Sequence, residues 1–282
     1  MRVITENERA GARVVALGTF DGVHMGHREL ILRGKAMAEA LGARLRVCTF
    51  DRHPLEILNP GRAPRRLETA EEQAARMEEL GVDELRVIPF TRETADTEPE
   101  DFLRQLEEEC EIRALTAGWN YTFGKKGRGN PELLQREGLR AGFRVEIIPP
   151  VRTPQGEVIS STAIRDRLMR GDLEGANCML GYSYRITGRA AGQPEWDAET
   201  GLYRIRIETE ARKQLPANGD YGCELNCGGM KLNAGIRIAD KAGAQEDNSS
   251  IELRIPGEIT IPEKQVIRIE LTDSTVNRVH EQ

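Results

Sequence analysis

Apolar and polar positions follow two different patterns along the chain, and the change falls near residue 181. Before that point, short apolar runs rich in β-branched residues alternate with stretches whose apolar residues recur at helical spacing. The pattern predicts strands over 13–17, 45–50, 85–90, 114–118 and 143–149, and helices over 28–41, 69–80, 98–109, 131–141 and 163–170. Strands separated by helices are typical of a parallel sheet, so residues 1–181 are expected to form an α/β domain.

The second part of the chain has a different pattern. From Tyr182 onward the helical spacing stops, and six short alternating runs cover 182–188, 202–208, 221–226, 232–238, 251–255 and 266–271. Six short strands within about ninety residues are typical of a small antiparallel β-barrel. We therefore expect a second domain over residues 182–282.

Composition narrows the class of protein. The chain has 282 residues, of which 39% are hydrophobic and 30% charged, enough to build the cores of two domains. Its net charge of −6 argues against a nucleic-acid partner, and no apolar run is long enough to span a membrane. The acidic N-terminal segment lacks a signal-peptide core, so we expect a cytoplasmic protein. Its five cysteines are then expected to be reduced thiols, and a zinc site is not expected.

The first candidate site is the segment 18–27, Gly-Thr-Phe-Asp-Gly-Val-His-Met-Gly-His, between the first strand and the first helix. Gly18 and Gly22 let the backbone bend and approach a ligand closely. The helix start offers unpaired N–H groups and a partial positive charge, which suit a phosphate. His24 and His27 can face the same way and hydrogen-bond phosphate oxygens. The alternatives are an ordinary turn, a chance pair of histidines or half of a metal site.

Two further segments follow predicted strands, where parallel sheets bind ligands. The segment 50–54, Phe-Asp-Arg-His-Pro, is either a pocket wall or an ordinary strand exit. The segment 118–130 combines three aromatic residues, the amide of Asn120, several cations, and glycines such as Gly124. Such a mixture favours a binding loop, because a solvated basic loop would explain the cations but not the aromatic residues.

The last candidate is the segment 159–165, Ile-Ser-Ser-Thr-Ala-Ile-Arg, before a predicted helix. A helix N-cap explains one hydroxyl well, but it explains a run of three less well. Arg165 lies in the first turn, where the helix dipole disfavours a cation unless an anion is present. Hydroxyls, backbone N–H groups and this guanidinium together suggest a grip for a triphosphate.

The segments 18–27, 118–130 and 159–165 form three motifs that resemble the FAD synthetase module of bacterial bifunctional riboflavin kinase/FAD synthetases, a branch of the nucleotidylyltransferase superfamily with a His-x-Gly-His motif. The likeness covers about residues 12–181. Phe-Asp-Gly-Val before the histidines narrows the superfamily to the flavin branch, and Ile-Ser-Ser-Thr-x-Ile-Arg matches at every fixed position. Tyr121 replaces the commoner Phe of the middle motif. The resemblance implies a Rossmann-like nucleotidylyltransferase domain followed by a riboflavin-kinase-like barrel.

The resemblance also implies a function. The protein is expected to be an FMN adenylyltransferase that makes FAD and pyrophosphate from ATP and FMN, with Mg²⁺ because the leaving group is pyrophosphate. The residues implied to be catalytic are His24, His27 and Arg165. Those implied to bind the nucleotide are Gly18, Phe20, Asp21, Gly22, Gly26, Ser160, Ser161 and Thr162. Those implied to bind the flavin are Phe50, Pro54, Asn120, Phe123 and Gly124. No residue is assigned to a metal held by the protein, and self-association into a homo-oligomer stays open.

The barrel departs from the family pattern. The kinase signature of the family is a Gly-rich turn that leads into Pro-Thr-Ala-Asn, whose Thr and Asn hold metal and phosphates. Here the segment 188–197 reads Gly-Arg-Ala-Ala-Gly-Gln-Pro-Glu-Trp-Asp, without Thr-Ala-Asn, and the usual C-terminal helix is missing. We therefore expect the barrel to be kept and the kinase chemistry to be lost, unless Glu195 or Asp197 supplies another metal arrangement.

Three other functions stay open. One is a full bifunctional enzyme, and the second is another cytidylyl- or adenylyltransferase of the same superfamily. The third is a flavin- or nucleotide-binding regulator without turnover.

Overall fold

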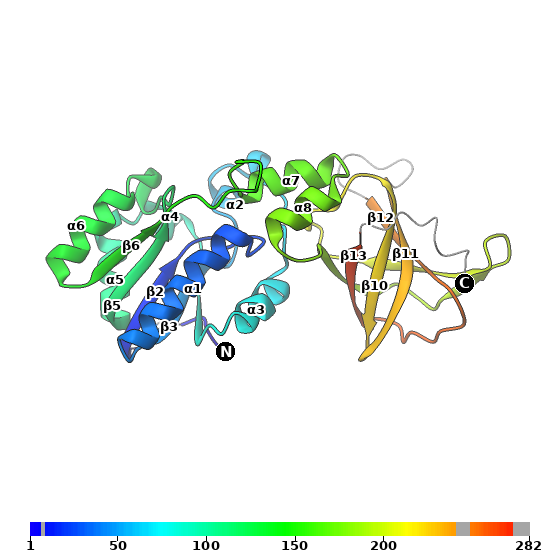
Figure 1. The fold of residues 1–282 in the computed structure, drawn as a ribbon, viewed down its shortest axis with the longest axis horizontal. Helices are drawn as coiled ribbons and strands as arrows, with labels where there is room; N and C mark the ends of the chain where they lie inside the picture. Colours follow the sequence, from blue (N-terminus) through cyan, green and yellow to red (C-terminus); the bar gives the residue numbers. More distant parts are fainter. Residues whose placement is uncertain (7–8, 241–248, 273–282) are drawn as a thin grey trace. The chain divides into compact units, whose positions relative to one another are not determined.

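The computed structural model describes residues 1–6, 9–240 and 249–272, which fall into two compact units (Figure 1). The first unit consists of Met1–Pro64 and Ala70–Ile159, and the second of Arg65–Thr69 and Ser160–Gln282. Contacts group the helices α7 (Ser161–Met169) and α8 (Leu173–Leu180) with the second unit. The domain boundary at residue 181 stays a prediction.

The first unit is built on a six-stranded sheet with the order β1-β4-β3-β2-β5-β6, and every neighbouring pair is parallel. The strands are β1 (Arg2–Ile4), β2 (Ala10–Leu17), β3 (Arg44–Phe50), β4 (Glu84–Ile88), β5 (Cys110–Gly118) and β6 (Arg144–Ile148). The strand order reverses between β2 and β5. In open parallel sheets, ligands bind at such a reversal, outside the carboxyl ends of the strands.

Helices cover both faces of this sheet (Figure 1). Alternate residues of β2 belong to opposite cores: Val14 and Ala16 pack with α1 (Met25–Ala40) and α3 (Ala70–Glu79). Val15 and Leu17 pack with α5 (Pro99–Glu109) and α6 (Pro131–Ala141). Shorter helical segments complete the unit: α2 (Leu55–Leu58), η1 (Pro60–Arg62), α4 (Arg92–Asp96) and η2 (Lys125–Gly127).

The predicted α/β class is confirmed, and its helix ends follow local chemistry. Helix α6 illustrates this, since Asn130 caps it by accepting the Leu133 N–H at 2.9 Å. Pro131 occupies the first turn, and Gly142 ends the helix with φ of 83°. The strand β1 was not predicted, because its three residues are too few to show a period.

The second unit contains a closed antiparallel barrel of six strands, as predicted. The order is β12-β11-β10-β13-β7-β9, and a pairing between β12 and β9 closes the ring. The strands are β7 (Arg185–Ala190), β9 (Leu202–Glu208), β10 (Gly219–Cys227), β11 (Met230–Asp240), β12 (Ser249–Ile255) and β13 (Val266–Thr272). An additional short strand, β8 (Glu195–Asp197), pairs with β9 and was not predicted.

The short segment Arg65–Thr69 belongs to the barrel unit although both of its neighbours in sequence belong to the first unit. It forms a parallel bridge between Arg66 and Lys213. The Lys213 side chain is 2% exposed, and its Nζ donates to the Leu67 carbonyl at 2.7 Å. The chain therefore passes between the two units three times, near residues 64, 69 and 159.

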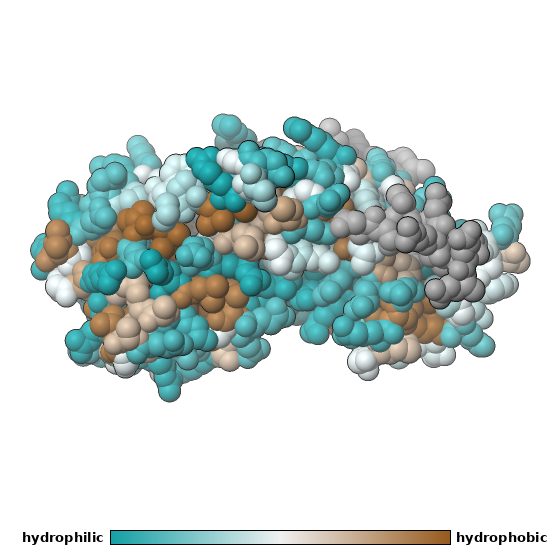
Figure 2. All heavy atoms as spheres, in the orientation of Figure 1, coloured by the Kyte–Doolittle hydropathy of each residue, from teal (hydrophilic) through white to brown (hydrophobic). Residues whose placement is uncertain are grey.

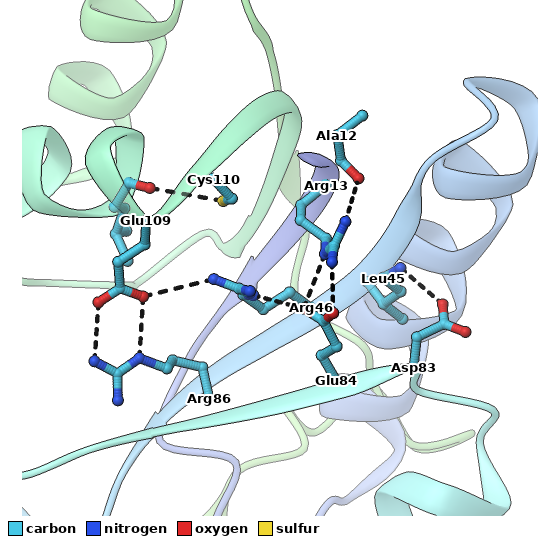
Figure 3. Close-up of polar contacts among 10 residues, drawn as sticks. Ala12, Arg13, Leu45, Arg46, Asp83, Glu84, Arg86, Glu109 and Cys110 are labelled. Atoms are coloured by element: carbon cyan, nitrogen blue, oxygen red, sulfur yellow. Dashed lines mark hydrogen bonds and ion pairs between the residues drawn. The ribbon is translucent and has the colours of Figure 1, made fainter. Parts of the chain in front are cut away.

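Charged side chains are buried near the amino ends of the strands in the first unit (Figure 3). Glu84 accepts hydrogen bonds from Arg13 at 2.6 and 2.8 Å and from Arg46 at 2.8 Å. Glu109 accepts from Arg86 at 2.9 and 3.0 Å and lies 3.5 Å from Arg46. Burial alone would raise the pKa of Glu84, but the hydrogen bonds from the two arginines outweigh burial and hold the pKa below its ordinary value.

Hydrophilic residues predominate on the face shown in Figure 2, and the hydrophobic residues there form separate groups. Isolated exposed apolar residues such as Leu139 on α6 are ordinary in globular proteins. Within the part of the chain that the structure describes, no helix is long and apolar enough to cross a membrane.

Replacing Glu84 with Gln is expected to lower the free energy of unfolding by about 3–5 kcal/mol, because Arg13 and Arg46 lose a buried partner charge. Urea unfolding measures the change. The matched control is Glu111→Gln, which removes one partner of the exposed pair with Arg113. It should cost less than about 1 kcal/mol. Equal losses in the two variants would show that the buried network contributes nothing beyond a surface pair.

Candidate functional site

The turn between β2 and α1 lies at the carboxyl end of β2, beside the reversal of strand order. Two of its non-glycine residues have a left-handed backbone, Phe20 with φ of 51° and Val23 with φ of 27°. Gly22 lies between them with φ of 84°. A non-glycine residue in this region costs on the order of 1–3 kcal/mol, and a β-branched residue is a true outlier. Surrounding structure must therefore hold this turn.

Side chains from two neighbouring elements bind the turn. The Gln73 amide nitrogen, from α3, donates to the Thr19 carbonyl at 3.1 Å and to the Phe20 carbonyl at 3.0 Å. The Thr49 hydroxyl, from β3, donates to the same Thr19 carbonyl at 3.0 Å. Neither residue stands out in the sequence as part of this site. A signal did exist for Gln73, which precedes the buried Met77 by one helical turn and so lies on the core side of its helix.

The two predicted histidines lie together at the start of α1. His24 is the N-cap of the helix, and its Nδ1 accepts the His27 backbone N–H at 3.3 Å. Because Nδ1 accepts, the proton of a neutral His24 ring is on Nε2. The two rings stack with centroids 3.7 Å apart, and the Phe20 ring meets His27 edge-on at 5.3 Å. The structure thus brings these two predicted catalytic residues together.

The His27 ring has a low proton affinity. Its Nδ1 is buried, and no hydrogen-bond partner for that atom exists among the described residues. Burial lowers the pKa of His27 well below its ordinary value of 6.5, and the His24 ring lowers it further. The ring is therefore neutral at pH 7, so it can act on a phosphate as a hydrogen-bond donor without carrying a permanent charge.

The glycines of this segment leave room for the rings. A Cβ atom at Gly26 would lie 3.2 Å from the His24 ring, and one at Gly18 would lie 3.0 Å from the Phe20 ring. Phe20 is completely buried and Asp21 nearly so. Phe20 therefore supports the site from inside the protein.

The loop after β5 divides into buried and exposed residues. The Phe123 ring is buried in the core, 5.7 Å from the rings of both Phe102 and Tyr121. Trp119 and Asn120 are exposed. Gly124 has φ of 66°, and a Cβ there would lie 2.7 Å from the Pro99 backbone. The structure therefore gives Phe123 and Gly124 a part in shaping the loop, and it leaves Asn120 accessible to a ligand.

The cations of this loop are engaged with a carboxylate. Glu98 accepts a hydrogen bond from Arg128, and its Oε1 lies 3.7 Å from the Lys125 Nζ. Sequence analysis did not single out Glu98, which is far from the loop in sequence. The pairing reduces the positive charge that the loop can offer to a phosphate.

The segment after β3 lies at the carboxyl edge of the same sheet. Phe50 is half-buried and meets the Phe90 ring edge-on at 4.9 Å. Pro54 is half-buried and precedes the short helix α2, and the His53 Nδ1 accepts the Leu55 N–H at 3.1 Å. Phe50 and Pro54 thus present partly exposed apolar surface.

The predicted triphosphate grip belongs to the second unit. Ser160 is the N-cap of α7, and its Oγ accepts the Ala163 N–H at 3.2 Å, which confirms the capping role for one of the three hydroxyls. Ser161 is half-buried and Thr162 is exposed. Arg165 is buried, and its Nε donates to the Arg65 carbonyl at 2.6 Å. A joint role of these residues with the histidines is a proposal, taken up below.

A resident metal site finds no support in the donor set. No three His, Cys, Asp or Glu side chains gather in the manner of metal ligands within the described ranges.

A parallel sheet whose strand order reverses beside a Gly-rich turn at a helix start defines a nucleotide-binding type of α/β protein. The family model described as FAD synthetase matches residues 6–163, which is more than half of the chain. The protein therefore belongs to the FAD synthetase family, as its motifs predicted.

Curated relatives extend the match into the barrel. The bifunctional riboflavin kinase/FMN adenylyltransferase of Listeria monocytogenes is 33% identical over 77% of this chain and 69% of its own length. The protein of the same name from Bacillus subtilis is 31% identical over 88% of this chain and 79% of its own length.

One solved structure shows the same fold. It is described as a macrolide-efflux protein from Streptococcus pneumoniae, with a TM-score of 0.84 over 98% of this chain and 91% of its own. At 23% identity, this likeness concerns the fold alone.

The depressed pKa of His27 makes stability depend on pH. An unfolded His27 takes up a proton near pH 6.5, whereas the folded ring stays neutral to lower pH, so stability falls as pH drops below 6.5. Between pH 7.5 and 5.5 wild type should lose about 1.4 kcal/mol more than His27→Gln. Urea unfolding followed by Trp119 fluorescence in a Trp196→Phe background measures it. Equal losses would place the His27 pKa near its ordinary value.

Proposed function

We propose that this protein is an FMN adenylyltransferase, which joins FMN to the adenylyl group of ATP and releases pyrophosphate. The observation that carries the proposal is the stacked pair of His24 and His27 at the start of a helix, in a chain of the FAD synthetase family. A cytoplasmic location agrees with this function.

The chemistry is an in-line displacement. A phosphate oxygen of FMN attacks the α-phosphorus of ATP, a new P–O bond forms, and the bond to pyrophosphate breaks. No protein nucleophile is required, so the protein contributes positioning and charge stabilisation. The His24 ring and the neutral His27 ring donate hydrogen bonds to phosphate oxygens as negative charge shifts toward pyrophosphate.

The other predicted residues take supporting roles. Ser161, Thr162 and Arg165 hold the β- and γ-phosphates of the Mg²⁺–ATP substrate. Asn120 orients the substrates, and Phe123 acts through the shape of its loop. The partly exposed surfaces of Phe50 and Pro54 lie against the isoalloxazine ring. Gly18, Gly22 and Gly26 allow close approach of the nucleotide.

His24→Ala is expected to lower kcat/KM for FAD formation at least about 100-fold, with the loss mainly in kcat, because the donor acts on charge that develops during transfer. Chromatography of the flavins and an assay for pyrophosphate measure the change. Near-wild-type turnover would contradict this role. A fall confined to ATP affinity would instead assign His24 to ground-state binding. Tight binding of FMN and ATP by wild type without pyrophosphate release would favour a regulator.

We also propose that the barrel has lost riboflavin kinase activity. The segment where the family has Pro-Thr-Ala-Asn forms β8, and its Asp197 serves the β8–β9 hairpin. The carboxylate accepts from Thr200 Oγ1, from the Glu199 N–H and from Arg204. The hydrogen bonds from Thr200 and Arg204 lower the pKa of Asp197 to about 2. An acceptor occupied in this way is a poor replacement for the missing metal ligands.

A cavity in the barrel and the names of the relatives favour the alternative of a bifunctional enzyme. A cavity of about 480 Å³ lies beside β8, lined by Ala191, Gln193, Glu195, Trp196, Asp197, Arg204, Ile205, Arg206 and Glu252. Relatives that align with part of the barrel are named as bifunctional.

The protein of 282 residues, incubated with ATP, Mg²⁺ and riboflavin, is expected to form neither FMN nor FAD, whereas FMN in place of riboflavin yields FAD. Chromatography separates the three flavins. Formation of FMN from riboflavin would establish the bifunctional alternative and would show that the barrel holds ATP without Thr-Ala-Asn.

A further inference from the structure

Gln73 of α3 is a buried amide that binds the turn just before the two histidines in sequence. Its side chain is 5% exposed, and its single amide nitrogen donates to two successive carbonyls, those of Thr19 and Phe20. The Phe20 carbonyl also accepts the Val23 N–H at 3.1 Å. These bonds act on the part of the turn whose backbone is left-handed.

We propose that Gln73 is a positioning residue for the reaction, which holds Phe20 in its left-handed conformation and thereby fixes the orientation of the His27 ring. The proposal rests on the proposed function, because it assigns the His27 ring a part in adenylyl transfer.

The contacts form a continuous path from the amide to the imidazole. With its carbonyl held, Phe20 turns its ring back over Gly18, where an added Cβ would lie 3.0 Å away. The same ring meets the edge of His27 at 5.3 Å. His27 is then confined between the Phe20 ring and the stacked His24 ring. Without the two bonds from Gln73, the strained backbone can relax and the Phe20 ring no longer sets this geometry.

The arrangement also keeps the Nδ1 atom of His27 away from solvent. The pKa of His27 is low because of burial and the adjacent His24 ring. Asp21 and Arg28 are the other charged groups within the same turn and first helical turn. Loosening of the turn would hydrate the Nδ1 atom of His27. The titration of His27 therefore reports whether Gln73 holds the turn, and it requires no substrate.

The test compares Gln73→Met, which keeps the length of the side chain without a donor, with Gln73→Glu, whose buried carboxyl is protonated beside two carbonyl oxygens and keeps one donor in place of the amide. Nitrogen NMR of the imidazole rings against pH is practical because the chain has four histidines. We expect the titration midpoint of His27 to rise toward 6.5 in both variants, further in Gln73→Met, which keeps no donor. The value of kcat should fall about 10- to 100-fold, with KM for ATP within about twofold of wild type.

Leu103→Ala provides the control for a loss of stability alone. Leu103 is also buried but lies in the core on the opposite face of the sheet, so this variant should leave the His27 titration unchanged. If Gln73→Met does not fold, Thr49→Val removes the neighbouring bond to the Thr19 carbonyl, and Thr49→Ser restores it. A smaller rise of the His27 midpoint is expected in Thr49→Val, which loses one bond, than in variants at Gln73, which makes two, and none is expected in Thr49→Ser.

A wild-type His27 titration in Gln73→Met and Gln73→Glu, or in Thr49→Val where those do not fold, would overturn the proposal. A fall in kcat without a change in the titration would also overturn it, because the effect would then bypass His27. If wild type makes no FAD, the proposed function fails, and the titration still decides whether Gln73 holds the turn.

Discussion

The left-handed backbone between β2 and α1 is the constraint on which the histidine site depends. Phe20 and Val23 lie in a region that non-glycine residues avoid, and in this geometry the chain enters α1 with His24 as its cap. The conformation is maintained from outside the segment, by the side chains of Gln73 and Thr49. The glycines of the turn therefore do not fix its backbone geometry on their own. Its geometry comes from the sheet and a covering helix.

The two ends of the parallel strands use polar groups in opposite ways. At the amino ends, Glu84 and Glu109 are paired with three arginines, and charges of both signs are satisfied within the protein. Near the carboxyl ends, His27 retains a buried nitrogen that no group within the described residues satisfies. An unsatisfied buried polar atom costs free energy, which a bound ligand can return. The sheet thus combines a rigid end with an end suited to binding.

Sequence periodicity predicted most of the fold, because the apolar residues of β2 and α6 have neighbours at the spacing that each element requires. The histidines were located by a local sequence motif, the segment 18–27, and not by periodicity. Periodicity could not place the Phe123 ring in the core, because an aromatic residue in a loop suits either a ligand or a core. It could not reveal the pairing of Glu98 with Arg128, or the action of Gln73 on Phe20, because these contacts join residues distant in sequence.

The assignment of Arg65–Thr69 to the barrel unit limits how the gene for such a protein can recombine. Two units joined by a single linker can be exchanged by one genetic crossover, but this barrel includes a piece encoded within the first unit. A gene fragment for residues 160–282 would leave the buried Lys213 ammonium without the Leu67 carbonyl. The barrel is therefore not a detachable module. If the proposed loss of kinase activity holds, divergence of residues, as at Glu195–Asp197, is then a more accessible outcome than deletion of the unit.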